Sequence, residues 1–272
     1  MAGVALTSLA GSGAAACVSG SDRVLRRAFT TMSSAPIGVG DAIGATRARI
    51  EQLAGELGLA RAPRLVAVSK TKPLPLLLEA YEAGQRDFGE NYAQELIDKA
   101  PQLPADIRWR FIGALQSNKA RPLVHGVPGL TCVETVDRLK VANALDAAVA
   151  SSARCASTLG IMLQVNTSGE QSKSGCEPTD ARALAAEIAA RCAHLTIAGL
   201  MTIGAPRPAL EPGTDDPDFA CLTRCRADVA DALGVPAESL ELSMGMSGDW
   251  ERAIRQGSTS VRVGSAIFGA RA

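Results

Sequence analysis

The chain has 272 residues, of which 47% are hydrophobic and 21% charged, and its 28 lysine and arginine residues balance its 28 aspartate and glutamate residues. This composition is typical of a globular protein with ample material for a core. A formal net charge of zero and nine aromatic residues argue against nucleic acid as a partner, which needs a basic surface and aromatic stacking platforms. We also expect no membrane partner, because no apolar run reaches the ~18 residues of a membrane span.

The first 40 residues differ in composition from the rest. They are rich in Ala, Gly and Ser, carry Arg23, Arg26 and Arg27, and contain Asp22 as their one acidic residue. Acid-poor segments that carry Arg and Ser are typical of organellar transit peptides. We therefore expect residues 1–40 to be a mitochondrial presequence, ahead of a plastid one. The alternatives are a disordered tail or translation from Met32, either of which would leave a cytoplasmic protein.

From Asp41 onward, helical and extended segments alternate. A helix is predicted over 41–57, with Ile43, Ile50 and Leu53 on one apolar face and Gly58 as its stop. Extended apolar segments follow at 64–69, 86–91, 109–115, 130–136, 160–166, 196–204, 240–245 and 260–266. Helical segments separate most of them, at 74–84, 91–100, 137–150, 179–193, 218–234 and 248–257, with a brief helix in the link 117–127.

This alternation predicts parallel β-α units. Eight such units in a chain of this length predict an α/β fold, a single (β/α)8 TIM barrel over residues 41–272 with an extra N-terminal helix. An open doubly wound sheet is the alternative. It is disfavoured because no G-x-G-x-x-G sequence follows the first strand.

Polar residues gather where the predicted strands end, and barrels of this type build their sites at the carboxyl ends of their strands. Lys70 ends the first strand, with Val66 and Val68 pointing to the same side. The other residues at this edge are Asn91, Gln116, Asn118, Lys119, Asn166, Met201, Thr202 and the run 243–247. An ordinary surface lysine at a strand end is the alternative for Lys70.

The last two strands lead into glycine and serine. Ser247 and Gly248 follow the seventh strand, and Gly264 and Ser265 follow the eighth. Loops in these positions often bind phosphate through backbone N–H groups, hydroxyls and a helix N-terminus. Either motif alone would indicate common turn chemistry. Together, at the expected strand ends, they favour a phosphate site.

Arg262 lies between Val261 and Val263, so its side chain projects to the face opposite theirs. Inside a barrel such a charge needs a partner. An arginine that pairs with a carboxylate beneath a helix is the alternative. A lysine, a phosphate site and an inward arginine together suggest pyridoxal phosphate, whose aldehyde forms a Schiff base with lysine.

The seven cysteines include no C-x-x-C pair. Cys221 and Cys225 lie one helical turn apart, but no ligand spacing links them to His125 or His194. We expect reduced thiols and no metal site.

Six segments resemble the signature segments of the pyridoxal phosphate homeostasis proteins: VAVSKTKP, FGENYAQEL, FIGALQSNKAR, LQVNTSGEQSKSG, GLMTIG and LSMGMSGDWERAIRQGSTSVRVGSAIFG. The resemblance covers residues 41–269 in order and leaves out the first 40. It implies a barrel related to the N-terminal domain of alanine racemase, with pyridoxal phosphate bound to Lys70.

The resemblance also implies roles for other residues. Ser247, Gly264 and Ser265 would hold the phosphate, Arg262 would face the pyridine nitrogen, and Asn91 and Met201 would line the pocket. Gly248 would lie at the cofactor, in a position where Ala or Ser is usual. Ala114 and Trp250 also depart from the family pattern, which often has His and Phe there, and neither departure removes a group assigned to the cofactor.

We expect a non-catalytic, monomeric carrier and buffer of pyridoxal phosphate in vitamin B6 homeostasis, with apo forms of pyridoxal phosphate enzymes as recipients. The alternative is a small pyridoxal phosphate-dependent amino-acid racemase. Related racemases use a second domain and a second proton-transfer group, and we expect neither here. Tyr81 and Tyr92 lie on predicted helices, so we see no second proton-transfer group opposite Lys70. A guanidinium is a very weak acid, so Arg262 would not readily protonate the ring nitrogen. The cofactor ring would then be a weaker electron sink.

The presequence prediction can be tested with a reporter. Residues 1–40 fused to a fluorescent protein should carry it into mitochondria, and Arg26→Glu with Arg27→Glu should stop import, because transit peptides act through positive charge. Fluorescence microscopy against a mitochondrial marker measures both results. A reporter that stays in the cytosol would count against a presequence.

Overall fold

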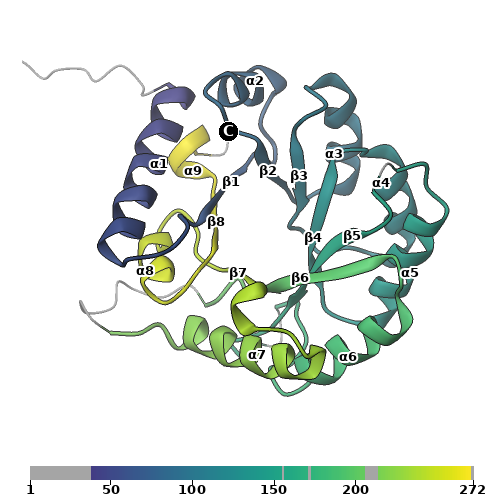
Figure 1. The fold of residues 1–272 in the computed structure, drawn as a ribbon. Coiled ribbons are helices and arrows are strands. Elements are labelled where there is room, and N and C mark those ends of the chain that lie inside the picture. Colours follow the sequence, from purple (N-terminus) through teal and green to yellow (C-terminus); the bar gives the residue numbers. More distant parts are fainter. Residues whose placement is uncertain (1–37, 155, 171–172, 206–213, 271–272) are drawn as a thin grey trace, which may run out of the picture. The chain divides into compact units, whose positions relative to one another are not determined.

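The computed structural model describes residues 38–270 except 155, 171–172 and 206–213, so the predicted presequence lies almost wholly outside the described residues. Eight parallel strands form a closed barrel in chain order, and helices surround it (Figure 1). The predicted (β/α)8 fold is therefore confirmed.

The strands lie within the eight predicted segments or begin one residue before them, and most end before the predicted segment does. Their bounds are β1 Arg64–Val68, β2 Asp87–Glu90, β3 Arg108–Phe111, β4 Leu130–Val136, β5 Leu159–Gln164, β6 Leu195–Met201, β7 Glu241–Ser243 and β8 Ser260–Val263. The ring closes where β8 pairs with β1, with Val66 opposite Arg262 and Ala67 opposite Val263.

The helices cover the outside of the barrel (Figure 1). Their bounds are α1 Val39–Glu56, α2 Leu74–Glu82, α3 Ala93–Lys99, α4 Ala120–Gly126, α5 Leu139–Ala150, α6 Ala181–Arg191, α7 Pro217–Leu233, α8 Trp250–Arg255 and α9 Ser265–Phe268, with short 3-10 turns at Ala100–Gln102, Ser117–Lys119 and Ala237–Ser239. Helix α1 is the extra N-terminal helix. It begins two residues before the predicted Asp41, because Gly38 takes the extended N-cap conformation and leaves Asp41 in the first turn.

Alternation along β1 separates two environments. Leu65 and Ala67 belong to the apolar layer between the strands and the helices. Val66 and Val68 face the barrel interior, where a Cβ atom at Gly89 would lie 3.0 Å from Val66 Cγ1 and 3.6 Å from Val68 Cγ2. The parity predicted for Lys70 therefore directs its side chain inward as well.

Charged side chains fill much of the barrel interior at the amino ends of the strands. We call the following six residues the charge ladder: Arg64, Asp87, Arg108, Arg110, Glu134 and Glu241. Asp87 accepts from Arg64 at 3.3 Å and from Arg108 at 2.6 Å, and Glu241 accepts from Arg64 at 2.8 Å and from Arg110 at 3.2 Å. Arg110 also pairs with Glu134, which is fully buried.

Glu134 connects the charge ladder to the carboxyl end of the barrel. Its Oε2 accepts a hydrogen bond of 2.6 Å from the Ser243 hydroxyl, which in turn accepts one of 2.7 Å from Arg262. Burial opposes the ionisation of Glu134, but the charges of Arg110 and Arg262 and the two hydrogen bonds outweigh it and lower the pKa of this carboxyl group. Glu134 is thus an anion between two buried arginines.

The variant Glu134→Gln tests this arrangement. The folded-state pKa of Glu134 lies below its usual value of 4.5, so its stabilising contribution is present above pH 4.5 and is lost as the pH falls through the folded-state pKa. At neutral pH the variant should lose about 3–5 kcal/mol of unfolding free energy, because Arg110 loses its buried partner. Urea unfolding at a series of pH values should show this difference shrinking below pH 4.5.

A control is Glu187→Gln, which replaces an exposed carboxylate on α6 and should change the stability little at any pH. A difference between wild type and Glu134→Gln that stays the same down to acid pH would contradict the assignment of charge to Glu134.

Candidate functional site

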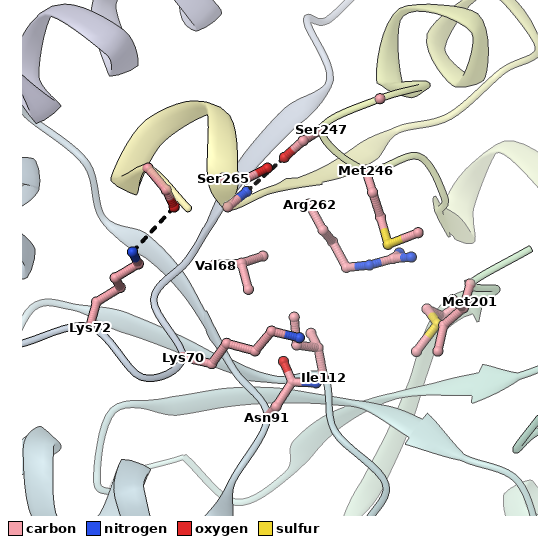
Figure 2. A pocket seen from close by; sticks show the side chains of 14 residues that line it. Val68, Lys70, Lys72, Asn91, Ile112, Met201, Met246, Ser247, Arg262 and Ser265 are labelled. Atoms are coloured by element: carbon pink, nitrogen blue, oxygen red, sulfur yellow. Dashed lines mark hydrogen bonds between the residues drawn. The ribbon is translucent and has the colours of Figure 1, made fainter. Parts of the chain in front are cut away.

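A pocket of about 380 Å³ opens at the carboxyl ends of the strands (Figure 2). It is lined by all eight residues that the sequence analysis assigned to the cofactor: Lys70, Asn91, Met201, Ser247, Gly248, Arg262, Gly264 and Ser265. Six others complete the lining: Val68, Lys72, Ile112, Ile203, Met246 and Gly269. Residues more than 190 positions apart in the chain thus share one cavity.

Lys70 follows β1 and points into this pocket, with its amine near Asn91 and Ile112 (Figure 2). Asn91 follows β2, and its buried Oδ1 has no hydrogen-bond partner among the described residues. A buried amide group without a partner costs free energy, and the two ends of an amide exchange by a simple flip. Asn91 is therefore ready to bond a polar atom of a ligand beside Lys70.

The loops after β7 and β8 meet at one wall of the pocket. The backbone N–H of Gly264 donates to the Ser247 hydroxyl over 3.2 Å, which ties the two loops together. A Cβ atom at Gly264 would approach the Val68 carbonyl oxygen to 3.3 Å, whereas one at Gly248 would meet nothing within 4 Å. This wall therefore carries the serines Ser247 and Ser265, with open space beside Gly248.

Arg262 reaches into the pocket from β8, and only 4% of its surface is exposed. Its guanidinium donates to the Ser243 hydroxyl and to the Thr202 carbonyl oxygen, both over 2.7 Å. It lies inside the barrel and not beneath a helix, so the alternative weighed from the sequence does not hold. Burial lowers the pKa of Arg262 from its ordinary value, and the charge of Glu134, reached through Ser243, offsets this only in part.

Apolar side chains form the remaining walls. Met201 is fully buried at the end of β6, and Met246 lies on the other side of the Arg262 guanidinium (Figure 2). Ile203 and Met246 are about two-fifths exposed, so they form the rim. The cavity therefore suits a flat apolar ring with polar groups at its edges.

Lys72 is a pocket residue that the sequence reasoning missed. Its amine donates to the carbonyl oxygens of Gly269 and Ala270, over 3.2 and 2.7 Å, and so ties the turn after β1 to the end of α9. Its position two residues after Lys70 was the available signal, but the proline that follows made it look like part of a turn. Val68, Ile112 and Met246 carry no chemical signal in the sequence.

Other polar residues at the strand ends do not line the pocket. Gln116, Asn118 and Lys119 lie at the 3-10 turn before α4. The Asn166 amide donates to the Glu170 carbonyl oxygen over 3.1 Å, and Thr202 shares a hydrogen bond of 2.8 Å with Thr167. These residues organise loops around the site.

The two tyrosines also lie outside the pocket. Tyr81 is on α2 and donates to Asp106 over 2.7 Å. Tyr92 immediately precedes α3 and is more than half exposed. Within the described part of the chain, no three metal-ligating side chains form a cluster, and no helix has the length and apolarity needed to span a membrane.

The sequence matches the family model described as the alanine racemase N-terminal domain over residues 42–272. It is 46% identical to the pyridoxal phosphate homeostasis protein of Bos taurus, over 88% of this chain and 89% of that protein. It is 45% identical to the protein of the same name from Pseudomonas aeruginosa, over 86% of this chain and 96% of that one.

Solved structures show the same relationship. PipY of Synechococcus elongatus has been solved without and with PLP bound, and it matches with TM-scores of 0.69 and 0.67 at 33% identity, over 85% of this chain and all of PipY. The alanine racemase of Corynebacterium glutamicum shares the fold at 15% identity, with a TM-score of 0.57, and this chain covers 61% of it. This chain therefore belongs to the alanine racemase N-terminal-domain family and, within it, to the pyridoxal phosphate homeostasis proteins.

Proposed function

We propose that the pocket binds pyridoxal 5'-phosphate and that the protein is a carrier and buffer of this cofactor in vitamin B6 homeostasis. The observation that carries the proposal is the meeting of Lys70, the two serine loops and Arg262 in one cavity. The name shared by the relatives and the PLP bound to PipY support it.

The residues of the pocket fit the parts of this cofactor. Bound pyridoxal phosphate supplies an aldehyde that condenses with a lysine amine and releases water. Lys70 offers that amine, and the hydroxyls of Ser247 and Ser265 offer donors for a phosphate group. Asn91, with its unsatisfied amide oxygen, lies beside Lys70 and can bond a polar substituent of the ring.

Arg262 favours holding the cofactor over reacting with it. Ser243 and Thr202 fix the orientation of its guanidinium. A guanidinium can donate a hydrogen bond to a ring nitrogen, but it is a far weaker acid than a carboxyl group and transfers its proton poorly. Carbanion chemistry needs the ring to draw electrons, so this neighbour weakens the ring as an electron sink.

The bases around the pocket lead to the same conclusion. Racemisation needs a base on each face of the substrate. The amine of Lys72 is engaged by two carbonyl oxygens, and Tyr81 and Tyr92 do not line the cavity. Lys70 is therefore the one base that we assign to the site, and the racemase is the less favoured alternative.

Three further features belong to the same proposal. The protein acts as a monomer, and apo forms of pyridoxal phosphate enzymes are the recipients of its cofactor. Its location is mitochondrial if residues 1–40 are a presequence, and cytoplasmic otherwise.

Cofactor binding can be tested by spectroscopy and trapping. The protein mixed with pyridoxal phosphate should absorb in the visible range, and borohydride should fix the cofactor to the peptide that contains Lys70. Ser247→Ala or Ser265→Ala should weaken binding about ten- to a hundredfold, since a hydrogen bond to a charged group is worth about 1.5–3 kcal/mol. Pyridoxal, which lacks the phosphate, is the control ligand and should bind far more weakly than pyridoxal phosphate. Equal affinity for these two ligands would contradict the phosphate site. Mass spectrometry that found the adduct on Lys72 or Lys119 would overturn the role of Lys70.

The second prediction concerns turnover. The protein loaded with pyridoxal phosphate should accumulate no D-alanine from L-alanine, because the site has one assigned base and a guanidinium beside the ring. Chiral chromatography over hours measures this, with an alanine racemase as the positive control. Racemisation at roughly one turnover per second or faster would establish the enzyme alternative.

A further inference from the structure

A second lysine, Lys99, is buried behind Lys70 on the outer side of the barrel wall. It ends α3, and 8% of its surface is exposed. Buried lysines need partners. The amine of Lys99 donates to Glu90 Oε1 over 2.9 Å, to Glu95 Oε1 over 2.5 Å and to the Ser69 carbonyl oxygen over 2.9 Å. We call Glu90, Glu95 and Lys99 the lysine clamp.

The clamp contacts the residues on both sides of Lys70. Before it, the Ser69 hydroxyl donates to Glu90 Oε1 over 2.7 Å, and the Ser69 carbonyl oxygen accepts from Lys99. After it, the backbone N–H of Thr71 donates to Glu95 Oε1 over 2.6 Å. Glu90 on β2 and Glu95 and Lys99 on α3 therefore hold the backbone on both sides of Lys70 by hydrogen bonds.

The backbone of this turn is strained at Thr71. Within the described ranges, Thr71 is the one non-glycine residue with a positive φ, at 61°. A β-branched residue seldom adopts this conformation. The turn is closed by a hydrogen bond of 3.1 Å from the Lys72 N–H to the Ser69 carbonyl oxygen. Such strain persists only where the surroundings hold it, and the Glu95 carboxylate accepts the N–H of the strained residue itself.

From these contacts we infer that the lysine clamp positions Lys70, so that its amine enters the pocket in the orientation that captures an aldehyde. The inference rests on the proposed function of the pocket. The clamp itself does not line the cavity. Its hydrogen bonds go to Ser69 and Thr71, so it acts on the cofactor through the turn that carries Lys70.

This separation provides the test. Pyridoxine 5'-phosphate has an alcohol in place of the aldehyde, so it can occupy the pocket but forms no covalent bond with Lys70. The experiment measures the rate at which visible absorbance appears with pyridoxal phosphate, and the affinity for pyridoxine 5'-phosphate by calorimetry. Loss of the lysine clamp should slow the reaction with pyridoxal phosphate and leave the affinity for pyridoxine 5'-phosphate unchanged.

The main variant is Glu95→Ala, because Glu95 is only partly buried and its loss is tolerable for folding. We expect capture to slow about tenfold, as for loss of a hydrogen bond to a charged group, with the affinity for pyridoxine 5'-phosphate within about twofold of wild type. Glu95→Gln keeps an acceptor oxygen for the Thr71 N–H and should restore most of the rate. Lys99→Met should resemble Glu95→Ala, and Lys140→Met, at an exposed lysine on α5, is the control.

The outcomes separate the two proposals. If Glu95→Ala captured pyridoxal phosphate as fast as wild type, or lost affinity for both ligands equally, the lysine clamp would be a structural ion pair and the inference would be wrong. If the wild-type protein bound neither ligand, the proposed function itself would fail. If Lys99→Met does not fold, the comparison of Glu95→Ala with Glu95→Gln still tests the inference.

Discussion

The pairing of β8 with β1 is the interaction on which the pocket depends. It places Val66 opposite Arg262 and Ala67 opposite Val263, and so brings the start of the barrel beside its end. Because Lys70 shares the inward parity of Val66, closure points its amine at the cavity that Arg262 enters from the next strand. The same closure lets Gly264 pass within reach of the Val68 carbonyl oxygen. An open sheet would have left these groups at opposite edges.

Two polar networks hold the key side chains, one on each side of the barrel wall. Inside, the charge ladder reaches Arg262 through Glu134 and Ser243. Outside, the lysine clamp reaches the turn around Lys70 through Ser69 and Thr71. Buried ion pairs add little net stability, since desolvation offsets their attraction, but their hydrogen bonds fix the directions of the groups that they join. The cavity between them can then be lined largely by apolar side chains and still present its few polar groups in fixed directions.

The groups behind Arg262 bear on our proposal that the protein stores a cofactor. An anion beside a ring nitrogen would promote proton sharing, whereas here the anion Glu134 is separated from the pocket by Ser243 and Arg262. A ring bound in the pocket would then meet the arginine and not the carboxylate.

The sequence by itself determined the barrel and the polar edge, because alternating strands and helices and the residues that end each strand are local patterns. Lys70, Arg262 and the serine loops were identifiable because strand parity and turn chemistry are local as well. The tertiary structure alone decided which groups surround them. Glu134 and Lys99 look like ordinary charges in the sequence, yet both are buried, and their partners lie on other elements, Arg110 on β3 and Ser69 just after β1. No local rule predicts such pairs, since the register between strands and the docking of α3 are fixed only when the barrel closes.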